Sequence, residues 1–115
     1  YPYRFCTVGD DVKVLIWSEG KSTEISNSHE LNILNCDWST KNYIATCGQD
    51  NRINLYYENK EIFTCFGHDN DINCVSWNPE GDLLLSVSDN CEVKIWKLVD
   101  ETNLMNIEME TETLI

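Results

Sequence analysis

The sequence has few basic residues for its length. Eight Lys and Arg residues stand against 20 Asp and Glu residues in a chain of 115, which gives a formal net charge of −12. Because phosphate groups bind to basic surfaces, this composition argues against unaided binding of nucleic acid. It also disfavours peripheral binding to an anionic membrane. Apolar runs are short as well, and no stretch approaches the ~20 residues that span a bilayer.

Cysteines are present, but the paired motifs of metal sites are missing. The six are Cys6, Cys36, Cys47, Cys65, Cys74 and Cys91. No two of them have the short spacing of zinc or iron–sulfur ligands, and neither His29 nor His68 lies beside a cysteine. Most of the cysteines sit in apolar stretches, so we predict free thiols that act as small buried hydrophobic residues. This predicts no metal and no cofactor, and a reducing compartment, which is the cytoplasm and also the nucleus.

A period of about 40 residues runs through the chain. Trp38 and Trp77 are 39 residues apart, and so are His29 and His68. Two further sets have spacings of 39 and 40: Trp17, Tyr56 and Trp96, and Asp11, Asp50 and Asn90. Repeats of this length with Trp and His are typical of the four-stranded blades of a β-propeller.

Alternating and short apolar segments between turn residues predict an all-β chain. We expect strands at residues 4–8, 13–17, 22–26, 33–38, 43–47, 52–57, 60–66, 71–77, 83–88 and 92–96. These give a partial β-propeller of roughly two and a half to three four-stranded antiparallel blades from a seven-bladed ring. We divide the chain into a partial blade (1–28), a repeat (29–67), a repeat with an acidic tail (68–110) and a frayed end (111–115). In the tail, Leu104–Met109 is a candidate for the outer strand of the last blade, and whether residues 98–110 form that strand stays open. The acidic run of the tail is a solvated extension or, as the alternative, a docking motif.

Several of these residues together resemble the WD-repeat family over residues 4–97. The resemblance rests on Gly67-His68, Asn78-Pro79-Glu80-Gly81, Asp11, Asp50, Trp17 and Trp96. In that family, a His, a Ser or Thr, an Asp and a Trp of one repeat form a buried hydrogen-bond network. The resemblance implies such a network from His68, Ser88, Asn90 and Trp96 in the last repeat, from His29, Asp50 and Tyr56 in the middle repeat, and from Asp11 and Trp17 in the first. Gly48 and Gly9 stand where the middle and first repeats would carry the hydroxyl.

The loops at one end of such blades are candidates for binding a partner. They carry Asp10, Glu30, Gln49, Asn51, Asp69, Asn70 and Asp89. An acidic rim favours a basic or polar protein segment through complementary charge; the alternative is that the charge serves solubility. We predict no catalytic residues, because recurring His and Asp residues are structural and the motifs of hydrolases, metalloproteases and phosphate-binding loops are missing.

The two full repeats look like the C-terminal repeats of the cytosolic iron–sulfur assembly WD-repeat family. Residues 71–97 resemble its last repeat, and residues 48–58 resemble the one before. The resemblance implies a non-enzymatic scaffold that works with iron–sulfur targeting adaptor subunits to deliver clusters to cytosolic and nuclear apoproteins. One alternative is a transducin-beta-like subunit of a deacetylase corepressor complex, and another is a propeller-based enzyme. The chain lacks an initiator Met, and fewer than three blades leave apolar flanks uncovered, so we expect part of a longer propeller. The alternative is that the chain completes its burial against another chain.

Overall fold

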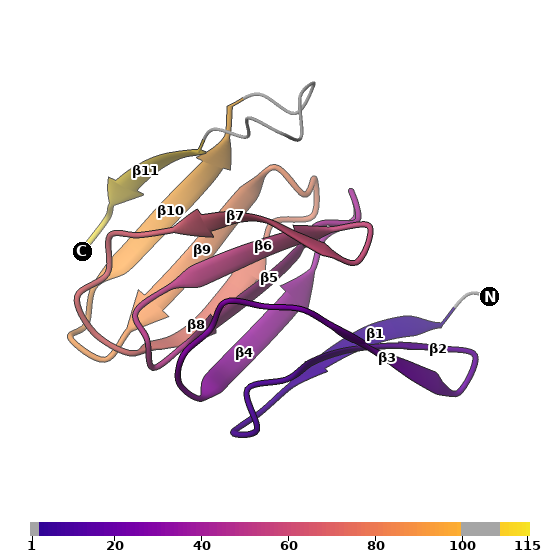
Figure 1. Ribbon diagram of the computed structural model, residues 1–115. Helices are drawn as coiled ribbons and strands as arrows, with labels where there is room; N and C mark the ends of the chain where they lie inside the picture. The colour runs from indigo at the N-terminus through magenta and orange to yellow at the C-terminus, as the bar shows by residue number, and fades with distance from the viewer. Residues whose placement is uncertain (1–2, 100–108) are drawn as a thin grey trace.

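The computed structural model describes residues 3–99 and 109–115 and consists of three antiparallel β-sheets (Figure 1). The first sheet contains β1 (Arg4–Val8), β2 (Val14–Ser18) and β3 (Lys21–Ile25). The second contains β4 (Ile33–Trp38), β5 (Ile44–Gly48), β6 (Ile53–Tyr57) and β7 (Lys60–Cys65). The third contains β8 (Ile72–Trp77), β9 (Leu83–Ser88), β10 (Val93–Leu98) and β11 (Met109–Thr113). The described residues include no helix, so the predicted all-β partial propeller is confirmed.

The strands follow the chain in each sheet, so the hairpins determine the pairing. The second sheet has the order β4-β5-β6-β7, and the third has β11-β10-β9-β8. The sheets stack on one another as Figure 1 shows: β8 contacts β4 and β5 of the second sheet, and β1 contacts β4. The contact of β1 with β4 between the first and second sheets therefore corresponds to the contact of β5 with β8 between the second and third sheets. This equivalence follows from the repeat, because β1 and β5 are the same strand of successive blades.

The core lies between the sheets in two clusters. One joins the first and second sheets and includes Val14, Ile33 and Tyr56. The other joins the second and third sheets, where Tyr43 and Trp77 lie with ring centroids 6.2 Å apart. Strand β5 contributes to both clusters from its two faces, with Ala45 and Cys47 in the second cluster and Ile44 in the first, because side chains alternate along a strand. A blade thus buries its apolar residues against a neighbouring blade.

The C-terminal segment differs from the prediction. We expected a strand at Leu104–Met109 and a frayed end at residues 111–115. The structure instead places β11 at Met109–Thr113, paired with β10, and Leu114 N donates a hydrogen bond to Val93 O at 2.8 Å. The polar alternation of Glu110, Thr111, Glu112 and Thr113 suits an exposed outer strand, because most of its side chains face solvent. Residues 104–108 of the predicted strand lie outside the described residues.

The turn after the second strand of each blade has a residue with positive φ. These residues are Val12 (φ 60°), Asn51 (φ 63°) and Cys91 (φ 65°). Asn tolerates this left-handed conformation, whereas Val and Cys do so at a cost. We therefore expect Cys91→Asn to raise the free energy of unfolding by about 0.5–1 kcal/mol, measured by urea denaturation. Cys91→Ser is the matched control: an equal gain in that variant would show that loss of the thiol, not relief of the backbone, is responsible.

Candidate functional site

Five loops lie along one end of the three sheets (Figure 1). They are the β1–β2, β5–β6 and β9–β10 turns and the β3–β4 and β7–β8 loops, which we call the loop rim (residues 9–13, 26–32, 49–52, 66–71 and 89–92). Backbone hydrogen bonds join them: Ile33 N donates to Gly9 O at 3.3 Å, and Gln49 N donates to Asn32 O at 3.0 Å. All seven residues predicted to bind a partner lie in the loop rim. Within that set, Gln49 and Asn51 are half-buried, and the other five are exposed.

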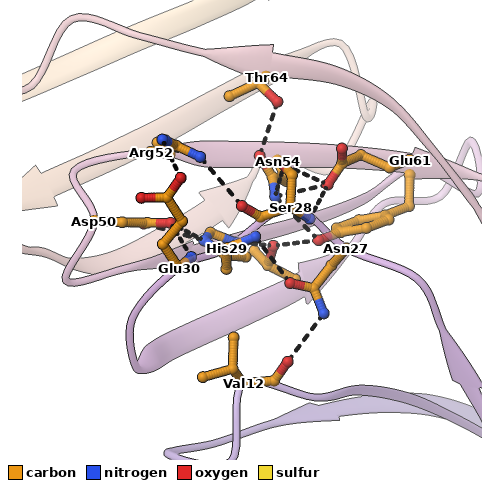
Figure 2. Close-up of polar contacts among 12 residues, drawn as sticks. Val12, Asn27, Ser28, His29, Glu30, Asp50, Arg52, Asn54, Glu61 and Thr64 are labelled. Atoms are coloured by element: carbon orange, nitrogen blue, oxygen red, sulfur yellow. Dashed lines mark hydrogen bonds and ion pairs between the residues drawn. The ribbon is translucent and has the colours of Figure 1, made fainter.

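Arg52 joins three of these loops, and Figure 2 shows its contacts with the β3–β4 loop. Its Nη2 atom lies 3.2 Å from Glu30 Oε1, and its Nη1 atom donates to Ser28 O at 3.1 Å. Its guanidinium also lies 5.8 Å from the ring centroid of Phe66. A further hydrogen bond joins the β3–β4 loop to the β5–β6 turn, because Glu30 N donates to Asp50 Oδ2 at 3.1 Å. The loop rim is thus a connected surface, and the charge of its arginine is paired with Glu30.

Two apolar side chains stand exposed on the loop rim. Phe66 is 68% exposed and Leu31 is 51% exposed. Phe66 contacts Arg52, and Leu31 follows Glu30 in the chain, so both border the Arg52–Glu30 pair. Single exposed apolar residues are common on protein surfaces, so it is the position of these two beside the Arg52–Glu30 pair that makes them candidates for contact with a partner. Neither residue is among those predicted from the sequence, because each adjoins a turn segment whose signal is its charged and polar residues.

His29 is the centre of a buried hydrogen-bond chain in the second sheet (Figure 2). Its side chain is fully buried, and Nδ1 lies 2.9 Å from Asp50 Oδ2, whose side chain is 4% exposed. His29 Nε2 lies 2.7 Å from Thr46 Oγ1, and that hydroxyl lies 3.0 Å from the Tyr56 hydroxyl. The structure therefore brings together His29, Asp50 and Tyr56 as the resemblance implied. The hydroxyl comes from Thr46 rather than from position 48.

Gly48 cannot carry the hydroxyl because no side chain fits there. A Cβ atom at this position would lie 2.3 Å from the carbonyl oxygen of Asn32 and 3.1 Å from the Ile33 Cα. Positions 46 and 48 point to the same face of β5, since side chains alternate along a strand. The network therefore uses the residue two positions earlier, where the strand faces the imidazole.

Tyr56 carries the chain of hydrogen bonds further than a tryptophan would. An indole N–H only donates, whereas a phenol hydroxyl both donates and accepts. The Tyr56 hydroxyl accepts from Asn54 Nδ2 at 3.4 Å, and Asn54 Nδ2 also donates to Glu61 Oε1 at 2.8 Å. Glu61 Oε1 accepts from Ser28 N at 2.8 Å, which returns the chain to the β3–β4 loop (Figure 2). Burial raises the pKa of Tyr56 to about 12, so the phenol stays protonated.

The third sheet builds its network from different residues than we expected. Ser86 Oγ lies 2.6 Å from His68 Nε2 and accepts a hydrogen bond from Trp96 Nε1 at 2.8 Å. The predicted hydroxyl, Ser88, instead donates to Asn90 Oδ1. Asn90 does not take the place of the acid, because Glu92 Oε1 is the carboxylate oxygen that faces His68 Nδ1, at 3.2 Å. That contact lacks hydrogen-bond geometry, so this network is less complete than the one around His29.

The first sheet contains the corresponding pair of Trp17 and Thr7. Trp17 Nε1 donates to Thr7 Oγ1 at 2.9 Å. Asp11 is exposed and accepts a hydrogen bond from Lys13 N at 3.2 Å, so it supports the turn. Gly9, where we expected the hydroxyl, accepts Val12 N and Ile33 N through its carbonyl. The signal that would have located the hydroxyls is in the sequence, because Thr7, Thr46 and Ser86 recur at spacings of 39 and 40 residues.

Burial lowers the pKa of His68, against the raising effect of Glu92. A histidine with a lower pKa in the folded state than in the unfolded chain binds protons more weakly when folded. Its contribution to stability is therefore complete above the unfolded value of about 6.5 and is lost as the pH falls below it. We expect the urea midpoint of the wild type to fall more steeply from pH 7.5 to pH 5.5 than that of His68→Asn. Parallel pH profiles would contradict this assignment.

The cysteines are more exposed than predicted. Cys47 and Cys65 are buried as expected, but Cys6 and Cys36 are half-buried, and Cys74 and Cys91 are exposed.

Among residues 3–99 and 109–115, no group of three or more His, Cys, Asp or Glu side chains is arranged to hold a metal ion. In the same part of the chain, no helix has the length and apolar character to cross a membrane.

Comparison with known proteins identifies the repeat. Residues 59–97 match the family model described as "WD domain, G-beta repeat". Residues 59–97 are therefore similar to one WD40 repeat. The matched WD40 segment begins in the β6–β7 turn and ends in β10, so it combines the outer strand of the second sheet with three strands of the third. A WD40 sequence repeat and a blade are therefore offset here by one strand.

Curated relatives of this chain are of several kinds. It is 38% identical over 71 residues to "WD40 repeat-containing protein HOS15" of Arabidopsis thaliana, covering 60% of this chain and 12% of the relative. It is 36% identical over 87 residues to "Protein CIA1" of the same plant, covering 64% and 25%. It is 33% identical over 90 residues to "Probable cytosolic iron-sulfur protein assembly protein CIAO1 homolog" of Dictyostelium discoideum, covering 68% and 27%. The chain thus spans only 12% to 27% of the length of these relatives.

Proposed function

We propose that this chain is a non-enzymatic protein-interaction scaffold whose loop rim binds a basic segment of a partner protein. The main support is that backbone hydrogen bonds and the contacts of Arg52 join the five loops into one surface. Asp10, Asp69 and Asp89 expose carboxylates on that surface. Their charge attracts a cationic segment during encounter and discriminates against acidic ones.

The exposed apolar residues would supply binding affinity that charge alone does not. Solvent-exposed ion pairs contribute little to affinity, because water and salt screen them. Phe66 and Leu31 offer aromatic and aliphatic area that a partner can cover, and buried aromatic contacts dominate the energy of many interfaces. The preferred ligand is therefore a segment that combines Lys or Arg with an apolar residue.

We place this scaffold in a cytosolic iron–sulfur cluster targeting complex, as part of a longer, seven-bladed propeller. Support comes from the Dictyostelium relative, whose name states cytosolic iron–sulfur protein assembly and which matches over 68% of this chain. The sequence resemblance of residues 48–58 and 71–97 to the last two repeats of that family agrees with it. The partners would be iron–sulfur targeting adaptor subunits, and the site of action would be the cytoplasm, with clusters delivered also to nuclear apoproteins.

Affinity purification of the full-length protein from its own cells, followed by mass spectrometry, tests this placement. We expect recovery of a small iron–sulfur targeting adaptor and its large helical-repeat companion. Recovery of a histone deacetylase with corepressor subunits would contradict it and would support the alternative of a transducin-beta-like subunit. Turnover of a small substrate by the purified protein, lost on changing His68, would contradict the non-enzymatic reading.

A further inference from the structure

Cys6 and Cys36 face each other between two blades. Cys6 lies on β1 of the first sheet and Cys36 lies on β4 of the second, 30 residues apart in the chain. The two Sγ atoms are 3.3 Å apart, and Cys36 Sγ lies 3.5 Å from the Cys6 carbonyl oxygen. Both residues are half-buried, so solvent and small oxidants reach this junction. The networks described above use neither thiol.

The two thiols differ in their readiness to ionise. The hydrogen bond from Cys6 lowers the pKa of Cys36, against burial and the neighbouring Asp37 carboxylate, which both raise it. The same hydrogen bond raises the pKa of Cys6, and burial adds to that effect. A thiolate is the reactive form of cysteine, so Cys36 is the nucleophile of the pair and Cys6 is positioned as the resolving thiol.

We propose that Cys6 and Cys36 form a reversible redox site that crosslinks the first blade to the second. With a peroxide as oxidant, the Cys36 thiolate attacks one oxygen, the O–O bond breaks, and hydroxide leaves to be protonated to water. Cys36 is then a sulfenic acid. The Cys6 sulfur attacks Cys36 Sγ, the S–O bond breaks, and the departing hydroxide takes the Cys6 proton as a second water. Two electrons pass from the two sulfur atoms to the peroxide. A dithiol reductant returns the disulfide to two thiols by thiol–disulfide exchange.

The sulfur–sulfur distance is longer than the roughly 2.05 Å of a disulfide, so bond formation requires a rotation of the side chains. The strands that carry the two cysteines already contact each other, and Ile33 N is hydrogen-bonded to Gly9 O close by. The crosslink therefore needs only a local change. Its consequence is a covalent tie between two sheets that otherwise associate through packing and hydrogen bonds.

Peptide mapping of the full-length protein without reduction tests the proposal. Trypsin releases Cys6 in residues 5–13 and Cys36 in residues 22–41, and each peptide contains one cysteine. After hydrogen peroxide treatment we expect a linked species lighter by two hydrogen atoms than the sum of the two peptides. Dithiothreitol should return both. In Cys6→Ser the linked species should vanish, and dimedone should trap residue 36 as a sulfenic acid.

The exposed cysteines provide the control. Cys74→Ser/Cys91→Ser removes both exposed thiols, and the yield of the linked species should be unchanged. Failure of peroxide to link residues 5–13 to residues 22–41 in the folded wild type would overturn the proposal. Linkage of Cys36 to Cys74 or Cys91 in place of Cys6 would overturn it equally, since Cys6 would then not be the resolving thiol. This site is independent of the proposed scaffold function.

Discussion

Replacing His29 with alanine is expected to lower the free energy of unfolding by about 3 kcal/mol, because it breaks a buried pair and leaves one charge without its partner. The imidazole is fully buried, and it contacts Asp50 Oδ2 at 2.9 Å and Thr46 Oγ1 at 2.7 Å. In the variant, Asp50 retains the backbone donor of Glu30 but loses the ring, and the Thr46 hydroxyl loses one of its two partners. Urea denaturation of the variant and the wild type measures the loss.

His68→Ala is the matched comparison in the next blade. We expect it to lower the free energy of unfolding by about half as much as His29→Ala does. His68 Nδ1 has no partner with hydrogen-bond geometry, and the facing Glu92 side chain is 27% exposed, so water solvates the carboxylate when the ring is removed. Both variants lose a similar packed volume. An equal or larger loss for His68→Ala would mean that packing, not the Asp50–His29–Thr46 hydrogen bonds, accounts for the effect.

Replacing Gly48 with alanine is expected to cost about 2–3 kcal/mol, since overpacking forces the backbone to move. The new Cβ would lie 2.3 Å from Asn32 O, a backbone atom that cannot rotate away. Relief requires the β3–β4 loop to separate from β5, which would break the hydrogen bond from Gln49 N to Asn32 O. The loss is measurable by urea denaturation.

Gly9→Ala tests the same change at the equivalent position of the first blade. There the added Cβ meets Asp11 Oδ1 at 3.5 Å, an ordinary van der Waals contact. We expect a change within about 0.5 kcal/mol, as for surface substitutions away from strained features. A Gly48→Ala variant as stable as Gly9→Ala would contradict the close approach of Asn32 to β5.

The strands were predictable because their signals are local. Alternation along residues 33–38 and the apolar run at residues 83–88 reproduce β4 and β9 with their observed bounds. β11 was misplaced, because Met109–Thr113 is a polar outer strand that relies on β10 for its hydrogen bonds. A strand with few apolar residues has no hydrophobic pattern of its own. Its position is determined by the strand with which it pairs, and the sequence alone does not show that pairing.

The site was predictable in its residue types but not in its register. His29, Asp50 and Tyr56 meet, yet the hydroxyl sits at Thr46, two residues from the expected Gly48. A shift of two keeps the same face of the strand, so strand alternation alone does not distinguish these positions. The recurrence of a hydroxyl at Thr7, Thr46 and Ser86 does distinguish them, and the close approach of Asn32 leaves no room for a side chain at position 48. In the third sheet, Glu92 faces His68 in place of Asn90, because the longer side chain of this residue, which directly precedes β10, reaches the imidazole.

The most direct test of the loop rim as a binding surface is to reverse its charge and measure partner recovery. In the full-length protein, Asp10→Lys/Asp69→Lys changes two exposed residues of the loop rim, and Glu24→Lys/Glu112→Lys makes the same charge change on the outer strands β3 and β11. We expect the first pair to reduce recovery of the bound partner about tenfold, and the second to leave it unchanged. Equal recovery with both pairs, or loss only with the outer-strand pair, would contradict the assignment.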